Sequence, residues 1–106
     1  MIVLFRLLEE FKNKLDEKLG NLICKIYIFG EYARGNYNED PELKVAVIVK
    51  RKLTKGEWGN IETIAMNIGE KYNKFFTVYE IELDKFEAEK SPLAKIVKRE
   101  GFELTF

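Results

Sequence analysis

The chain has 106 residues, with 18 basic and 18 acidic side chains and therefore no formal net charge. This length supports one modest hydrophobic core, so we expect a single domain over residues 1–106. A balanced charge lacks the basic excess that is typical of nucleic-acid-binding domains, which argues against nucleic acid as a partner. With one cysteine and no histidine, the chain can form neither an internal disulfide nor a Cys/His zinc site.

The first eleven residues, MIVLFRLLEEF, are apolar but do not have the pattern of a membrane segment. Arg6 interrupts them and a charged amphipathic pattern follows, which differs from a signal peptide and is too short to span a bilayer. We therefore expect a soluble, cytoplasmic protein that does not bind membranes. Charged residues make up 34% of the chain, and this bias, together with the absence of glutamine, is typical of proteins from thermophiles.

The first half of the chain predicts a helix followed by two strands. Residues 3–19 repeat apolar side chains at steps of three and four, as in an amphipathic helix, and Gly20 ends the pattern. Residues 23–29 and 43–49 are short runs of branched and aromatic side chains, which predict strands buried on both faces. Between them, residues 32–34 predict a single helical turn within a connector that is rich in turn-forming residues.

The middle of the chain predicts a second long helix and a third strand. Thr54 and Glu57 have the spacing of a capping box, which marks a helix start. Apolar residues then recur at helical steps: Ile61, Ile64, Ala65, Ile68 and Tyr72. Residues 75–83 alternate around branched and aromatic side chains and predict a strand.

The C-terminal part predicts a short helix and an edge strand. Ser91 and Pro92 are typical of a helix N-cap and first turn, and Gly101 ends the helix. Residues 102–106 predict a short edge strand. The order helix, strand, strand, helix, strand, helix predicts a small α+β domain in which helices cover a sheet.

Two segments resemble a known family. The stretch IYIFGEYARGNYNEDPELKVAVIVK resembles the core motif of the minimal nucleotidyltransferases (MNT-type domains), small members of the DNA polymerase β-like superfamily. That motif runs G-S-x-A-R-G, then D-x-D leading into a strand. The segment LDKFEAEKSPLAKIVKREGFEL is similar to the tail of many such domains. The resemblance implies a mixed sheet flanked by helices. It also implies a site where three carboxylates hold divalent metal ions that bind a nucleoside triphosphate.

The chain departs from the family pattern at the positions that carry this chemistry. Glu31 stands where the family has a serine that contacts phosphate, and its charge would repel a triphosphate. Glu42 falls on the first aspartate and Lys44 on the second; an ammonium group cannot ligate a metal. The third carboxylate aligns with Thr77 or Tyr79, and neither is acidic. The active site is therefore predicted to be degenerate.

Our first hypothesis is that the domain has lost metal-dependent catalysis, uses no cofactor and acts as a binding or interaction module. Fold and catalytic site are separable, so one can persist without the other. The resemblance implies a candidate partner, because many of these domains work beside an all-helical HEPN-type protein in toxin–antitoxin pairs. An antitoxin-like role beside such a protein, or self-association through an uncovered sheet edge, would follow.

The alternative hypothesis keeps the enzyme, which would move a nucleotidyl group from ATP to a protein or RNA acceptor. Asp40 and Glu42 would then hold Mg²⁺, while Gly30 and Arg34 would position the phosphates. This hypothesis requires that Asp40 and Glu42 converge near Gly30 and that Lys44 points away. Whether the chain is an enzyme stays open at this point.

Two further carboxylates bear on the alternative, because Glu80 and Glu82 lie on the third predicted strand. Their parity is opposite to that of Thr77 and Tyr79, so we expect them to face away from a site that those two line. A third hypothesis is a regulator that binds nucleotide without metal. The charge of Glu31 argues against it.

Several residues allow a plain structural role beside a functional one. Arg34 could bind phosphate or brace its own turn. Lys44 could pair with Glu42 or Glu31, or it could be a solvated lysine on an edge strand. Trp58 could anchor a partner or simply pack.

Four more side chains are expected to be ordinary packing residues. Phe75, Phe76 and Tyr79 are expected in the core, and only an exposed cluster of aromatic residues would indicate a docking patch. Cys24 is expected to pack, because nothing nearby in the sequence would activate its thiol.

Overall fold

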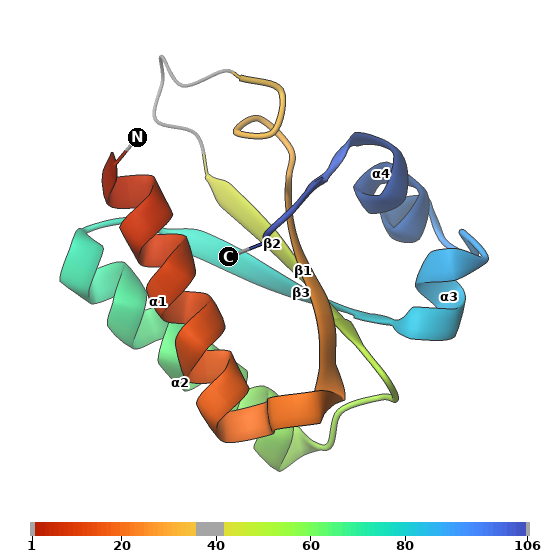
Figure 1. The fold of residues 1–106 in the computed structure, drawn as a ribbon, viewed down its shortest axis with the longest axis horizontal. Coiled ribbons are helices and arrows are strands. Elements are labelled where there is room, and N and C mark those ends of the chain that lie inside the picture. Colours follow the sequence, from red (N-terminus) through yellow and green to blue (C-terminus); the bar gives the residue numbers. More distant parts are fainter. Residues whose placement is uncertain (1, 36–41, 106) are drawn as a thin grey trace.

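The structure is a computed structural model that describes residues 2–35 and 42–105. Figure 1 shows helices packed around one sheet. In chain order the elements are α1 (Ile2–Leu19), a short 3-10 turn (Gly20–Leu22), β1 (Ile23–Phe29), β2 (Leu43–Val49), α2 (Lys55–Tyr72), β3 (Phe76–Glu82), α3 (Leu83–Glu87), α4 (Pro92–Glu100) and β4 (Phe102–Glu103).

The sheet has the strand order β3-β2-β1-β4. β1 runs antiparallel to both of its neighbours, β2 and β4, whereas β2 and β3 are parallel. A parallel pair needs a crossover connection, and α2 provides it. The mixed sheet flanked by helices confirms the predicted α+β class.

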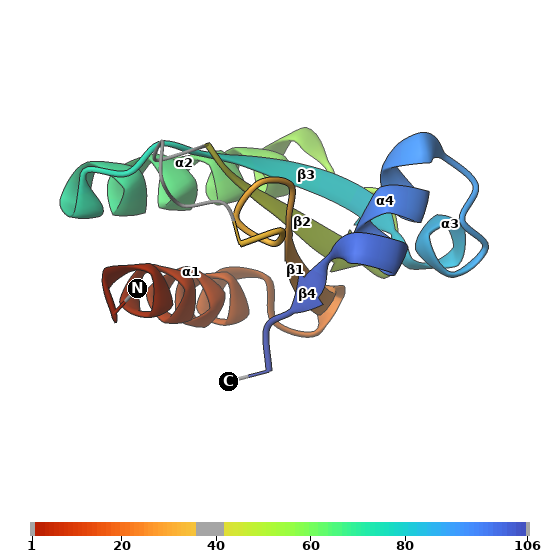
Figure 2. The same ribbon diagram turned by 90° about the horizontal axis from the view of Figure 1, so that it is seen from above.

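The helices lie on opposite faces of the sheet, with α1 and α2 on one side and α3 and α4 on the other (Figure 2). β2 serves both faces because successive side chains of a strand alternate. Val45 and Val47 pack with the α1–α2 side, while Ala46 and Ile48 pack with the α3–α4 side. By the same parity, the side chain of Lys44 belongs to the α3–α4 face.

Local sequence signals place the helix starts correctly. The Thr54 hydroxyl accepts a hydrogen bond from the Glu57 N–H at 3.1 Å, and the Glu57 carboxylate accepts one from the Thr54 N–H at 2.9 Å. The Ser91 hydroxyl accepts from the Ala94 N–H at 3.1 Å. Within the described residues, no helix is both long enough and apolar enough to cross a membrane.

Three expectations need correction. The helix α3 was not predicted; it follows β3 directly because Phe86, which is buried, turns back onto the sheet face formed with Ala46 and Ile48. In β1 only Ile26 and Phe29 are fully buried, so this strand is not covered on both faces along its length.

The third correction concerns Phe75, which was expected in the core. It precedes β3 and is 77% exposed, whereas Phe76 is buried in the α1–α2 cluster and Tyr79 is half-buried in the α3–α4 cluster. Cys24 packs against the α3–α4 cluster, as expected.

Candidate functional site

The family motif lies in the turn that follows β1. Gly30 has a φ of 81° and Gly35 a φ of 82°, a left-handed conformation that glycine adopts without steric cost. Between them the Arg34 N–H donates to the carbonyls of Gly30 and Glu31, both at 3.2 Å, and the Gly35 N–H donates to the Tyr32 carbonyl at 3.1 Å. The turn predicted at residues 32–34 is therefore present. The two glycines of the motif supply the left-handed backbone conformation at its ends.

The side chain of Lys44 lies across Gly30. Lys44 is half-buried on β2 and stands in register with Phe29 of β1 and Thr77 of β3. A methyl group built on Gly30 would come within 3.2 Å of Lys44 Cδ. The aliphatic stem of the lysine thus occupies the space directly beside the glycine.

Neither sequence-based interpretation of Lys44 describes this arrangement. β2 is an internal strand, so Lys44 is not on an edge. In residues 2–35 and 42–105, neither Glu31 nor Glu42 forms an ion pair with Lys44; Glu31 instead pairs with Arg34. The lysine is held by packing against the turn.

Arg34 braces the turn. Its Nη1 lies 2.9 Å from Glu31 Oε1, and its Nη2 lies 3.5 Å from Glu100 Oε1 at the end of α4. The three side chains are about half exposed, so these ion pairs add little to stability. Their main consequence is electrostatic, since the guanidinium offsets the charge of Glu31 that stands in place of the family serine.

A second basic side chain, Lys74, contacts the same turn. Its ammonium donates a hydrogen bond to the Tyr32 hydroxyl and lies 4.6 Å from the centroid of the Tyr32 ring. Tyr32 is buried, so Lys74 ties the start of β3 to the motif. Sequence analysis missed this contact, because no local spacing rule connects residues that are 42 positions apart.

The acidic residues do not rebuild the family's carboxylate cluster in the part of the chain that is described. Asp40 lies outside the described residues. Glu42 is exposed just before β2. The parallel register sets Thr77 beside Lys44 and Tyr79 beside Ala46, and neither of these β3 residues is acidic. Among residues 2–35 and 42–105, no group of three or more His, Cys, Asp or Glu side chains could hold a metal ion.

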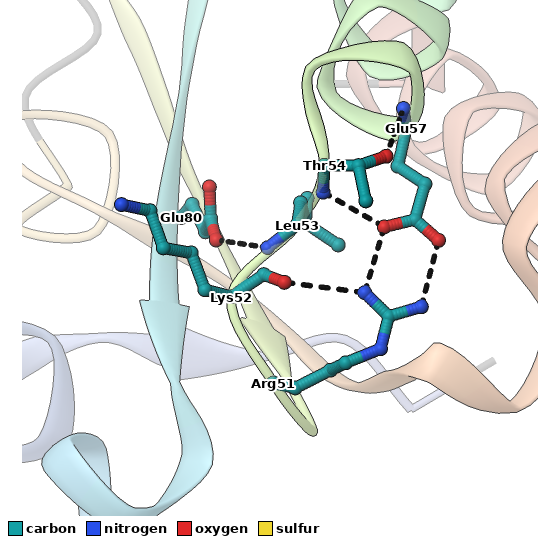
Figure 3. A network of polar contacts seen from close by, with 6 residues as sticks. All are labelled: Arg51, Lys52, Leu53, Thr54, Glu57 and Glu80. Carbon is teal, nitrogen blue, oxygen red and sulfur yellow. Dashed lines mark hydrogen bonds and ion pairs between the residues drawn. The ribbon is translucent and has the colours of Figure 1, made fainter.

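Glu80 and Glu82 serve structural roles elsewhere. Glu80 Oε2 accepts a hydrogen bond of 2.8 Å from the Leu53 N–H, at the start of α2 (Figure 3). Glu82 Oε2 lies 3.0 Å from the Lys85 ammonium. The contact with Leu53 puts Glu80 on the α1–α2 side, whereas Tyr79 packs on the other face, as their parity predicted.

Comparisons with known proteins agree with this fold. No protein-family model matches the chain. A predicted protein adenylyltransferase of Methanocaldococcus jannaschii, MJ0141, is 31% identical over 70 residues, which cover 66% of this chain and 71% of MJ0141.

Solved structures show the same fold at low sequence identity. A chain from the toxin–antitoxin complex MntA–HpeT, in a mutant with two aspartates changed to glutamate, has a TM-score of 0.65 and 16% identity and covers 92% of this chain and 70% of that chain. A chain from the tri-AMPylated HEPN toxin of Shewanella oneidensis in complex with an MNT antitoxin has a TM-score of 0.52 and 16% identity, with coverage of 92% and 71%. With the G-x-x-A-R-G turn, the mixed sheet and the identity to MJ0141, the chain belongs to the minimal nucleotidyltransferase family.

Proposed function

We propose that this chain is a minimal nucleotidyltransferase-family protein that has lost metal-dependent transfer and acts by binding a protein partner, as an antitoxin does. The observation that carries the proposal is the position of Lys44. It stands at the family's second carboxylate and lies against Gly30, where the family motif meets its substrate's phosphates.

The chemistry of the site supports loss of the metal. Mg²⁺ prefers carboxylate oxygens in an octahedral arrangement, and the family supplies them from three positions. Here one of these positions carries an ammonium group, which cannot donate an electron pair to the metal and repels it. The neighbouring position on β3 is Thr77. Glu42 is thus the one family carboxylate position that stays acidic. A single carboxylate is too few to hold the divalent metal ions that the family binds.

The comparisons support the choice of partner. Both solved structures described above are toxin–antitoxin complexes, and in one of them the toxin is a HEPN protein. The turn that would have held substrate is instead braced by Arg34 and Lys74. A turn that is braced in this way, beside a lysine at the family's second carboxylate position, is suited to a binding surface. The partner that we propose is an all-helical HEPN-type protein.

Calorimetric titration with ATP, with and without Mg²⁺, tests the loss of catalysis. We expect no Mg²⁺-dependent binding by the natural chain. The Lys44→Asp variant returns a second carboxylate next to Glu42, and we expect it to gain Mg²⁺-dependent binding, whereas Lys44→Ala should not. Both variants also remove the aliphatic stem of Lys44 beside Gly30. The difference in ATP binding between them therefore reports the effect of the new carboxylate alone.

The opposite result would support the alternative hypothesis, an active nucleotidyltransferase. Mg²⁺-dependent ATP binding by the natural chain that disappears in Glu42→Ala, and survives in Glu87→Ala on the surface of α3, would show that a working metal site remains. ATP would then be tested as a donor of its nucleotidyl group to a protein or RNA acceptor.

Co-expression with an all-helical HEPN-type protein tests the second half of the proposal. We expect the two to elute together in gel filtration, and we expect Lys44→Asp to leave that complex unchanged. Separate elution of the two proteins would rule out this partner, whatever the outcome with ATP.

A further inference from the structure

A groove with a volume of about 810 Å³ lies between α2 and the outer side of β3. We call it the α2–β3 groove. Two of its apolar side chains are strongly exposed, Met66 at 63% and Phe75 at 77%. The apolar residues that line it are Trp58, Ala65, Met66, Gly69, Phe75, Phe76 and Val78. The other lining residues are polar: Glu62, Glu70, Asn73, Lys74 and Thr77. Large apolar side chains that are exposed among polar neighbours mark a candidate interaction site.

The groove runs beside an open sheet edge. β3 is the last strand on its side of the sheet and pairs with β2 along its whole length, Phe76–Glu82. Within the described residues, no strand pairs with its other side. The outward N–H and C=O groups of an edge strand form a template for one more strand. An occupant of the groove therefore has to supply a strand to β3 and apolar side chains to α2.

A second copy of this chain supplies both at the required spacing. Neighbouring strands lie about 4.8 Å apart and packed helices about 8–10 Å apart, so one helix covers roughly two strands. Here α1 contacts β1 and α2 contacts β3. If β3 paired with β3 of a second copy, the two α2 helices would become neighbours on the same face of a continuous sheet. We infer that the chain forms a two-fold dimer through β3 and the exposed flank of α2.

The charges along β3 favour an antiparallel arrangement. Lys74 precedes the strand and Glu82 ends it. Pairing around Val78 sets Lys74 of each copy opposite Glu82 of the other, whereas parallel pairing would set like charges side by side. Lys74 also donates to Tyr32, and Glu82 pairs with Lys85. The antiparallel arrangement places opposite charges at the two strand ends.

The flank of α2 also suits contact with itself. It carries two large side chains, Trp58 and Met66, and two small residues, Ala65 and Gly69, all lining the groove. Two exposed carboxylates, Glu62 and Glu70, also line it, and in the dimer they would have to stay at its solvated margin. When two such flanks meet in opposite directions, large side chains of one helix can enter the spaces over small residues of the other. An isologous contact of this kind closes after two copies.

This dimer is independent of the proposed loss of catalysis. Of the described residues around the Gly30 turn, Lys74 and Thr77 are the two that also line the groove. If the chain is monomeric, the proposed function is unaffected. If a working metal site is found, the inferred dimer is unaffected.

Light scattering coupled to gel filtration tests the inference. We expect a particle of twice the 12.5 kDa mass of one chain. Met66→Arg puts a charge on the exposed groove wall and should yield the monomer. The matched control is Asn67→Arg at the next position of α2, which is exposed but does not line the groove, and it should keep the dimer. A monomeric natural chain, or a dimer that survives Met66→Arg, would overturn the inference.

Cross-linking tests the position of the two-fold axis. Directly opposed residues of antiparallel strands have Cα atoms about 4.5–5.5 Å apart, within the range of a disulfide. In a Cys24→Ala background, Val78→Cys should therefore form a covalent dimer on oxidation. Thr63→Cys, exposed on α2 outside the groove, should not. A dimer in which Val78→Cys stays unlinked would overturn pairing around Val78.

Discussion

The start of α2 and the Gly30 turn are both built from polar residues, yet their partners come from different distances along the chain. At the start of α2 most partners are local: Thr54 and Glu57 cap each other, and Arg51 places two nitrogens at 2.8 Å from the two Glu57 oxygens (Figure 3). One contact there is long-range, since Glu80 accepts from the Leu53 N–H. At the turn, the contacts come from Lys44, Lys74 and Glu100.

This difference separates what a motif specifies from what the fold adds. The capping box carries its own contacts, so the sequence motif and the structure agree. The G-x-x-A-R-G segment specifies only the backbone of the turn, while distant residues decide its charge and the space beside it. A family motif can therefore persist in the backbone after the chemistry around it has changed.

The largest effect is expected at Gly30. Gly30→Ala forces a side chain into a left-handed conformation and brings it within 3.2 Å of Lys44 Cδ. We expect a loss of about 2 kcal/mol in the free energy of unfolding, measured by urea denaturation. The effect has two parts, because the backbone strain is local and the contact with Lys44 is long-range.

Gly35→Ala is the matched control for the backbone part. Gly35 has a similar φ of 82°, but among the described residues no atom lies within 4 Å of the added methyl group, so its loss should be smaller, about 1 kcal/mol. Combining Gly30→Ala with Lys44→Ala should recover the difference between the two. Equal losses at both glycines would mean that Lys44 does not restrict the space beside Gly30.

Most of the fold could be predicted from local patterns, because each pattern acts within one element. The strands at 23–29 and 43–49, and the helix starts at Thr54 and Ser91, agree with the structure. The helix α3 was missed because five residues are too few to show a helical period.

The candidate site was less predictable, since its decisive contacts are long-range. The substitution at Lys44 could be read from the motif, but its packing against Gly30 depends on the pairing of β1 with β2. The contact of Lys74 with Tyr32 and the exposure of Phe75 likewise arise from how β3 enters the sheet. Periodicity carries no information of that kind.

A smaller effect is expected at the N-cap of α2. Thr54→Ala removes the hydroxyl that accepts from the Glu57 N–H, and we expect a loss of about 1 kcal/mol. Thr54→Ser keeps the hydroxyl and should retain most of the stability. If thermal and urea unfolding show that the alanine and serine variants are equally stable, the cap contributes no more than the surrounding packing.

The smallest effect at neutral pH, and the most specific in its pH dependence, is expected at Glu57. Hydrogen bonds from the Arg51 guanidinium and from the Thr54 N–H lower the pKa of Glu57 from 4.5 to about 2. A carboxyl whose pKa is lower in the folded chain binds fewer protons there than in the unfolded chain, so its contribution to stability rises with pH. The contribution is complete above pH 4.5 and disappears as the pH falls toward about 2.

Glu57→Gln removes this titration while keeping the shape of the side chain. We expect the difference in unfolding free energy between the natural chain and Glu57→Gln to shrink from pH 4.5 to about 2, the window set by the two pKa values. Glu9→Gln, at an exposed carboxylate on α1, is the control for the loss of one surface charge. Since the Arg51–Glu57 pair is exposed to solvent, added salt should also reduce the Glu57 effect. A difference that stays constant across this pH window would mean that the Glu57 carboxylate is not paired in solution. The polar contacts left at the start of α2 would then be those of the Thr54 hydroxyl and the Glu80 carboxylate.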